Sequence, residues 1–143
     1  MSDHVDDRPP TRHLTEDECW QRIREAPYGR IASTAGGEID IFPVNHVVDE
    51  GTIVFRTSPG TKLLELTIRD SVAFEVDGYT DTDAFSVVVK GRAREFDHER
   101  EVAAAEQLGV TPWAPEEKDR WVRIIAREVH GRTFRRADTA SRG

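Results

Sequence analysis

The sequence has a single cysteine, Cys19, among its 143 residues. One cysteine cannot form an internal disulfide, which fits a protein of a reducing compartment. No apolar run approaches the roughly 18 residues that a membrane-spanning helix needs. The polar start MSDHVDDRPPTRH has no apolar centre of the kind found in signal peptides. We therefore expect a soluble, cytoplasmic protein that does not enter a membrane.

Several motifs of nucleotide and metal sites are also missing. There is no GxxxxGK loop and no GxGxxG fingerprint, so neither a P-loop nor a Rossmann nucleotide site is supported. The five histidines are scattered and no HExxH or Cys/His cluster occurs, so we predict no metal site. Cys19 lies on an apolar helical stripe and is predicted to be a core residue.

Acidic residues outnumber basic ones, with 27 Asp and Glu against 20 Lys and Arg, which gives a formal net charge of −7. This charge opposes general binding to nucleic acid or to an anionic membrane surface. A basic cluster in such a chain is expected to be local and to suit a small anionic ligand. The predicted partners are therefore a small molecule and, for reasons given below, a second copy of the chain.

The length indicates one domain. We expect flexible tails at 1–13 and 137–143 and a single domain at 14–136. Thr15 and Glu18 form a capping box at the start of a helix, which Pro27 then ends.

Six extended segments follow this helix and are separated by turn signals. They read YGRIASTA, EIDIFPVNHVV, TIVFRTS, SVAFEVDGY, AFSVVVKGRAREF and DRWVRIIAREVHGRTFRR. Gly-Gly at 36–37 and Asp-Glu-Gly at 49–51 are hairpin signatures. TKLLELTIRD and DHEREVAAAEQLG are predicted to be short helices. The expected fold class is mainly β with short helices (α+β), and few long crossovers favour a small antiparallel barrel over a doubly wound sheet.

The stretch TIVFRTSPGTKLLEL contains a bend between a strand and a helix. Phe55 is predicted to face the core and Arg56 the opposite side. Lys62 lies in the first helical turn, where a cation is unfavourable unless an anion is bound. Two explanations remain open. In the first, one phosphate is bound by Arg56, Lys62 and the hydroxyl groups between them. In the second, Arg56 pairs with one of the 27 acidic residues and Lys62 is solvated.

Five segments in order resemble a known family. PYGRIAS, DIFPVNHVVDEGTIVFRTSPGTKL, VAFEVDG, SVVVKGRAREF and TPWAPEEKDRWVRI resemble the small pyridoxamine 5′-phosphate oxidase-like, flavin-binding split-barrel proteins. The likeness covers roughly Thr15 to Arg135 and is strongest over Phe42 to Leu63. The resemblance implies a six-stranded antiparallel split β-barrel, usually a homodimer, with flavin mononucleotide (FMN) at the dimer interface.

The resemblance also implies site residues. Those assigned to the flavin phosphate come from the bend and are Arg56, Thr57, Ser58, Thr61 and Lys62. Those assigned to the flavin ring come from the preceding strand and are Pro43, Val44 and Asn45. Trp113 either fills the core or lines the flavin site of the other subunit. His46 faces opposite to Asn45 and is expected to pack or hydrogen-bond rather than to react.

The function that the resemblance implies is an FMN-binding oxidoreductase acting on a small organic substrate. One alternative keeps the fold but uses the deazaflavin coenzyme, whose acidic tail would need further cations such as Arg30, Lys90 or Arg132. Another is a non-catalytic flavin-binding or sensory protein. Pyridoxamine phosphate oxidation is not expected, because Arg127 and His130 do not reproduce the oxidase's Arg-x-His signature. No catalytic residue is predicted.

The strand SVVVKGRA supports the dimer independently. Phe85, Val87 and Val89 share one of its faces, yet Val88 makes the other face apolar as well. A strand with apolar side chains on both faces needs a second surface to bury against. We therefore expect a homodimer.

Overall fold

The computed structural model describes residues 10–35, 37–58, 60, 62–67, 71–96, 99–110 and 120–136. Its strands are β1 (Thr11–His13), β2 (Gly29–Ala35), β3 (Glu38–Val44), β4 (His46–Asp49), β5 (Thr52–Thr57), β6 (Ser71–Tyr79), β7 (Asp83–Glu95) and β8 (Arg120–Arg135). Its helices are α1 (Glu16–Glu25), α2 (Lys62–Thr67) and α3 (Glu99–Glu106). None of these described helices has the length and apolar character needed to cross a bilayer.

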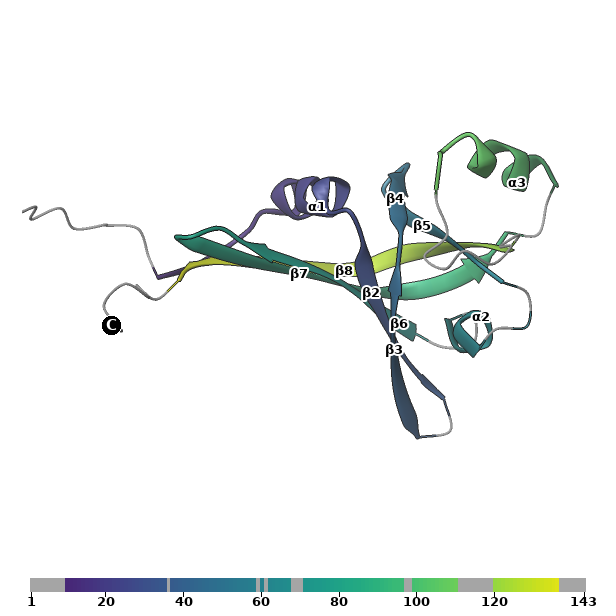
Figure 1. The fold of residues 1–143 in the computed structure, drawn as a ribbon, viewed down its shortest axis with the longest axis horizontal. Coiled ribbons are helices and arrows are strands. Elements are labelled where there is room, and N and C mark those ends of the chain that lie inside the picture. The colour runs from purple at the N-terminus through teal and green to yellow at the C-terminus, as the bar shows by residue number, and fades with distance from the viewer. Residues whose placement is uncertain are drawn as a thin grey trace, which may run out of the picture.

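The strands form one antiparallel sheet in the order β3-β2-β6-β7-β8-β5-β4, with β1 added beside β8. The two edge strands, β3 and β4, are consecutive in the chain and separated only by Asn45. A sheet whose opposite edges are joined by one residue has to curl until those edges approach. The result is the predicted split barrel (Figure 1).

The strand count differs from the prediction, because the described residues form eight strands instead of six. The segment EIDIFPVNHVV was expected to be one strand, but Asn45 divides it into β3 and β4. The polar residues of β1, which we expected within a flexible tail, pair with β8 in the register Thr11↔Phe134 and His13↔Arg132. Backbone pairing of this kind needs no apolar side chains, so hydrophobic periodicity does not reveal it.

Local signals explain the helix start and the tight hairpin. Thr15 accepts a hydrogen bond from the Glu18 backbone N–H at 3.2 Å, and Glu18 accepts one from the Thr15 N–H at 2.9 Å. This is the predicted capping box. In the β4–β5 hairpin, Glu50 and Gly51 have φ values of 49° and 73°. Two successive positive φ values are typical of the type I′ turn that joins strands with a right-handed twist.

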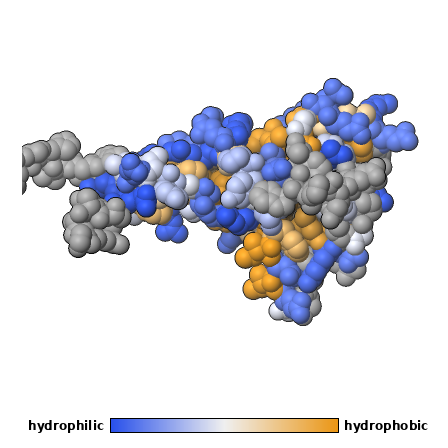
Figure 2. All heavy atoms as spheres, viewed as in Figure 1, coloured by the Kyte–Doolittle hydropathy of each residue, from blue (hydrophilic) through white to orange (hydrophobic). Residues whose placement is uncertain are grey.

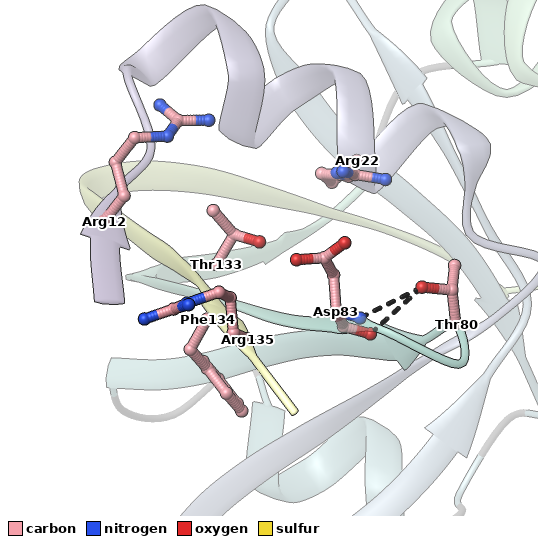
Figure 3. Close-up of a pocket in the computed structure, with 7 residues that line it drawn as sticks. All are labelled: Arg12, Arg22, Thr80, Asp83, Thr133, Phe134 and Arg135. Atoms are coloured by element: carbon pink, nitrogen blue, oxygen red, sulfur yellow. Dashed lines mark hydrogen bonds between the residues drawn. The ribbon is translucent and has the colours of Figure 1, made fainter. Parts of the chain in front are cut away.

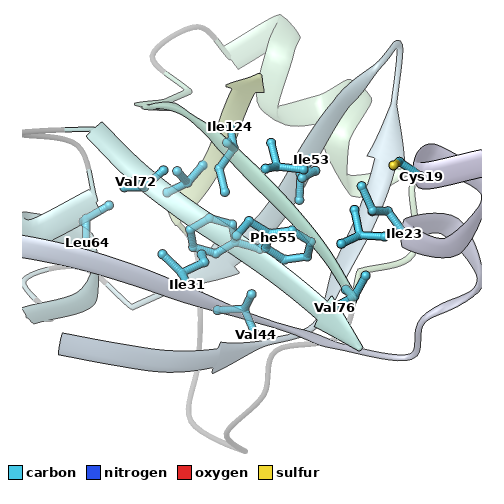
Figure 4. Close-up of a cluster of buried hydrophobic side chains, with 14 residues drawn as sticks. Cys19, Ile23, Ile31, Val44, Ile53, Phe55, Leu64, Val72, Val76 and Ile124 are labelled. Carbon is cyan, nitrogen blue, oxygen red and sulfur yellow. The ribbon is translucent and has the colours of Figure 1, made fainter. Parts of the chain in front are cut away.

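The hydrophobic core fills the inside of the curled sheet (Figure 4). Phe55 and Ile53 point into it and are fully buried, as alternation along β5 predicts. Ile23 of α1 and Leu64 of α2 enter it from opposite ends in Figure 4. Burial of each such side chain stabilises the folded state by about 1.5–3 kcal/mol. The two helices therefore cover opposite ends of the barrel.

The outer side of β5 is covered as well. Val54 is fully buried in a second cluster with Trp121 of β8 and Ala105 of α3. The two faces of β5 thus belong to different cores. Arg56, which shares a face with Val54, consequently lies beside packed apolar side chains instead of in open solvent.

A bulge interrupts the long antiparallel pair of β7 and β8. The register between these strands shifts between Lys90 and Gly91. A Cβ atom at Gly91 would clash with the carbonyl oxygen of Ile125. Glycine is therefore required where the two backbones approach most closely.

Candidate functional site

The predicted phosphate-binding residues surround the bend between β5 and α2. Thr57 is buried on the inner face of β5, Ser58 is half-buried, and Gly60 has a φ of 70° that turns the chain. Lys62 is the first residue of α2 and is exposed. Thr61 lies outside the described residues. The bend thus carries two hydroxyl residues, Thr57 and Ser58, four to five residues before the exposed Lys62.

Arg56 is held on the outer side of the bend. Its guanidinium carbon lies 4.8 Å from the centre of the Trp121 ring, which is a cation–π contact. Its Nη1 donates a long hydrogen bond of 3.5 Å to the carbonyl oxygen of Val110. Arg56 therefore both packs on β8 and binds the segment that follows α3.

Lys62 is held on the inner side by two carboxylates of β3. Its Nζ donates to Oδ1 of Asp40 at 3.4 Å and lies 3.3 Å from Oδ2 of the same residue. The distance from Nζ to Oε2 of Glu38 is 3.8 Å. The two cations predicted to share one phosphate are thus attached to different elements in this structure.

The acidic neighbours of Lys62 were missed in the sequence, although a signal for them exists. Alternation along EIDIFPV puts Asp40 on the same face as Phe42 and Val44, which point inward. An acid among inward-facing apolar positions indicates a specific partner. That the partner is Lys62 depends on the tertiary placement of α2 against the β2–β3 hairpin.

The predicted ring-contacting residues lie on two different faces of the sheet. Pro43 is exposed on the outer face, whereas the Val44 side chain is 2% exposed and belongs to the core. A cofactor could meet Val44 only through its backbone. Asn45 is half-buried at the corner between β3 and β4. Trp113 lies outside the described residues.

An ionisable cluster shares the outer face with Pro43. The cross-strand register pairs Pro43 with Arg30, and Arg30 with Glu75. Directly paired residues project from the same side of a sheet, and neighbouring strands are about 4.8 Å apart. Arg30 Nη1 lies 3.4 Å from Glu75 and 3.6 Å from Asp77. Arg30 therefore lies on the strand next to Pro43, and the carboxyl groups of Glu75 and Asp77 lie one strand further away.

One carboxyl group of this cluster, that of Glu75, has a raised pKa. Partial burial raises the pKa of Glu75 to about 7, helped by the hydrogen bond and negative charge of Asp77, while Arg30 acts in the opposite direction. Near neutral pH the carboxyl group of Glu75 is therefore partly protonated. Sequence analysis named Arg30 as a spare cation but did not identify Glu75, since the pairing of β2 with β6 could not be read from the sequence.

His46 packs and hydrogen-bonds, as the sequence predicted. Its side chain is buried, its Nε2 lies 2.7 Å from the carbonyl oxygen of Ile23, and its ring meets that of Phe74 edge-on at 4.9 Å. Burial lowers the pKa of His46, although the hydrogen bond to Ile23 partly opposes this. The imidazole therefore joins α1 to the corner next to Asn45.

A separate hollow of about 370 Å³ lies between α1 and the far ends of β7 and β8 (Figure 3). Two of its three arginines are engaged elsewhere: Arg12 pairs with Glu18, and the guanidinium carbon of Arg22 lies 4.6 Å from the centre of the Phe85 ring. The carboxylate of Asp83 projects into it. None of the predicted cofactor residues lines it, so we do not assign the site there. Among the described side chains, no three His, Cys, Asp or Glu residues form a metal-binding group.

An apolar patch lies on the outer face of the β2–β3 hairpin. Ile39 and Ile41 are 72% and 64% exposed, and Figure 2 shows the apolar surface at the position of this hairpin. A shallow hollow of about 270 Å³ beside Ile39 continues onto Ala32 and Ala73 of the neighbouring strands. Large exposed apolar side chains next to one another mark interaction surfaces.

Comparison with known proteins gives consistent results along the chain. The model of a family described as pyridoxamine 5′-phosphate oxidase matches residues 15–133. The uncharacterized protein Rv0080 of Mycobacterium tuberculosis is 32% identical over 129 residues, which cover 82% of this chain and 82% of the relative.

Solved structures agree with this result. The FAD-binding protein of Mycobacterium smegmatis superposes with a TM-score of 0.77 at 35% identity, over 87% of this chain and 98% of that chain. A Corynebacterium glutamicum protein, provisionally described as a pyridoxamine 5′-phosphate oxidase, gives a TM-score of 0.81 at 38% identity, over 89% of this chain and 95% of that chain. The family match includes β3, β5, the bend and α2.

Proposed function

The chain belongs to the pyridoxamine 5′-phosphate oxidase family, and from this premise we propose that it is an FMN-binding oxidoreductase acting on a small organic substrate. The donor chemistry of the bend supports the proposal most directly. The guanidinium of Arg56, the hydroxyls of Thr57 and Ser58 and the ammonium of Lys62 follow one another along a short stretch of chain. A relative of 35% identity is an FAD-binding protein, which supports a flavin as the ligand.

The residues present fit a phosphate group. Lys62 is more than half exposed and held by ion pairs of 3.3 and 3.8 Å, so its ammonium can turn toward an incoming anion. Arginine and lysine beside hydroxyl groups form charge-assisted hydrogen bonds with phosphate oxygens. The carboxylate of Asp40 is the competing partner that such an anion has to displace.

When bound, the flavin supplies the hydride and electron chemistry, and the protein supplies binding, orientation and protons. Arg56 and Lys62 bind the phosphate, which fixes one end of the ligand. Pro43 and the Asn45 corner orient the ring. Glu75, whose carboxyl pKa is about 7, lies on the face that carries Pro43 and can there donate a proton to a substrate undergoing reduction.

We further propose that the functional unit is a homodimer, formed through the outer face that carries Ile39 and Ile41. These side chains are too exposed for a stable free surface, and Val88 on the same sheet is only half-buried. A twofold interface uses the same patch on both chains and creates two equivalent ligand sites. The partner would also exclude water from the outer face next to Pro43.

Two related activities fit less well. Arg127 donates a hydrogen bond of 3.0 Å to Ser71, and His130 lies 3.3 Å from Glu128, so these residues do not form an Arg-x-His substrate site. The deazaflavin alternative needs further cations for an acidic tail, and of the candidates Arg30, Lys90 and Arg132, Arg30 already pairs with Glu75 and Asp77. Cys19 is a buried free thiol, which agrees with a cytoplasmic location.

Equilibrium titration tests the proposal. FMN should bind at least tenfold more tightly than riboflavin, because a charge-assisted hydrogen bond contributes about 1.5–3 kcal/mol. Equal affinities would refute a phosphate site at the bend. Turnover of the FMN complex with a reduced nicotinamide and an organic electron acceptor would separate an enzyme from a non-catalytic flavin-binding protein.

A further inference from the structure

The ion pair between Lys62 and Asp40 has an unequal geometry. Lys62 is mostly exposed, whereas the Asp40 side chain is 27% exposed. Oδ2 of Asp40 is fully buried, and no described group donates a well-aligned hydrogen bond to it. The nearest cation is the Lys62 ammonium at 3.3 Å. Asp40 therefore depends on Lys62 more than Lys62 depends on Asp40.

Asp40 cannot move away easily when Lys62 binds another anion. It lies in the interior of β3, where its backbone pairs with the buried Ser33 of β2, and the next inward-facing residues toward the core are Phe42 and Val44. An anion bound by Lys62 would thus approach a fixed carboxylate. The resulting repulsion grows with the charge of the anion. Glu38 adds a second, more exposed carboxylate at 3.8 Å.

Phosphate groups of flavins differ in this charge. A phosphate monoester such as that of FMN carries about −1.5 to −2 charges near pH 7, because its second pKa is about 6. The two phosphate groups of a flavin dinucleotide form a pyrophosphate, which lacks that second ionisation and spreads its two charges over both groups, one on each. A fixed carboxylate beside Lys62 therefore penalises the monoester more than the pyrophosphate.

We infer that Asp40 is a specificity-determining residue of the phosphate site, which competes with the ligand for Lys62 and disfavours the dianionic phosphate of FMN relative to the pyrophosphate of FAD. The inference rests on the proposed function, since it requires the flavin phosphate to bind at Lys62. It assigns to the family's flavin site an acidic contact that weakens binding and selects between ligands.

The test is a titration of riboflavin, FMN and FAD against the full-length protein and Asp40→Asn at pH 8, where the monoester is a dianion. FMN affinity should rise about threefold to tenfold in Asp40→Asn. FAD affinity should rise less and riboflavin affinity should stay within twofold. Glu38→Gln should act in the same direction but more weakly, because its carboxylate is more distant and 76% exposed. Asp17→Asn on the exposed face of α1 is the control for net charge.

The outcomes of these titrations distinguish a failure of the proposed phosphate site from a failure of the inference about Asp40. If the wild type binds riboflavin as tightly as FMN, the phosphate site itself is wrong and the inference falls with it. If the wild type prefers FMN over riboflavin but Asp40→Asn leaves that preference unchanged or reduces it, Asp40 is a supporting partner of Lys62 and the inference alone is overturned. Circular dichroism melting of both variants identifies any loss of fold, and Glu38→Gln then carries the comparison.

Discussion

The Nε2 atom of His46 lies 2.7 Å from the carbonyl oxygen of Ile23 and donates a hydrogen bond to it. A carbonyl can only accept, so Nε2 carries the proton and Nδ1 is an unprotonated acceptor in the neutral ring. Nδ1 is buried and has no hydrogen-bond partner among the described residues. One side chain thus links the last turns of α1 to the corner at which the two sheet edges meet.

The protein should lose stability in mild acid because of His46. Its folded pKa is lowered from 6.5, chiefly by burial. Below pH 6.5 the unfolded chain binds a proton at this position and the folded chain does not, so stability falls from about pH 6.5 down to the folded pKa. Urea unfolding at pH 7.5 and 5.5 should show this fall in the wild type and a smaller one in His46→Gln.

His130→Gln provides the matched control for that measurement. His130 is 71% exposed at its side chain, so its replacement should leave the pH dependence of the wild type almost unchanged. A His46→Gln variant that retains the full wild-type loss between pH 7.5 and 5.5 would assign the acid sensitivity to other groups.

The two cations of the bend should differ in their effects. Lys62→Ala and Arg56→Ala should each weaken FMN binding roughly tenfold to a hundredfold, because each removes a charge-assisted hydrogen bond. The two variants should lower the melting temperature for different reasons, because Arg56→Ala removes a guanidinium that packs on Trp121, whereas Lys62→Ala removes the cation nearest to the buried Oδ2 of Asp40. Fluorescence titration and thermal melting measure the two effects separately.

Riboflavin is the internal control for these variants, because it lacks the phosphate. Its affinity should change by less than about threefold in Lys62→Ala, since the lost cation has no phosphate to bind. A variant that binds FMN like the wild type would remove its cation from the phosphate site, and a large loss for riboflavin would point to general damage.

Neutralising Glu75 should stabilise the protein in mild alkali. Its pKa is raised to about 7 from 4.5, mainly by burial and then by Asp77. The unfolded chain releases the proton near pH 4.5 but the folded chain retains it to about 7, so the stability of the wild type relative to the Glu75→Gln variant falls across this interval. Glu75→Gln should therefore melt at a higher temperature than the wild type at pH 8, with a smaller difference at pH 4.5. If the two proteins differed more in melting temperature at pH 4.5 than at pH 8, the raised pKa of Glu75 would be contradicted.

Charge on the apolar patch should separate the proposed dimer. Sedimentation equilibrium at low micromolar concentration should show a dimer for the wild type and a monomer for Ile39→Lys, since a twofold interface doubles the number of buried ammonium groups. Tyr79→Lys is the matched control, because Tyr79 is 75% exposed at the far end of β6. A wild type that sediments as a monomer yet binds FMN tightly would refute a site completed by the partner.

The sequence alone determined most of the local structure. The capping box at Thr15 and Glu18, the turn at Glu50 and Gly51, and the opposite directions of Phe55 and Arg56 were predicted correctly. These features depend on contacts between residues a few positions apart, where backbone geometry fixes the outcome. The bend and its cations were identified for the same reason.

The tertiary structure decided which distant groups meet. The ion pair of Lys62 with Asp40, the stacking of Arg56 on Trp121, and the row that joins Pro43 through Arg30 to Glu75 all cross between separate elements. Strand order and register set these contacts, and a single sequence does not encode them in any local pattern. Two carboxyl groups and an arginine form one ion-paired cluster only when β2 lies beside β6. The cations and hydroxyl groups of the bend could therefore be identified from the sequence, whereas the contact of Lys62 with Asp40 and the cluster of Arg30, Glu75 and Asp77 depend on how the sheet curls.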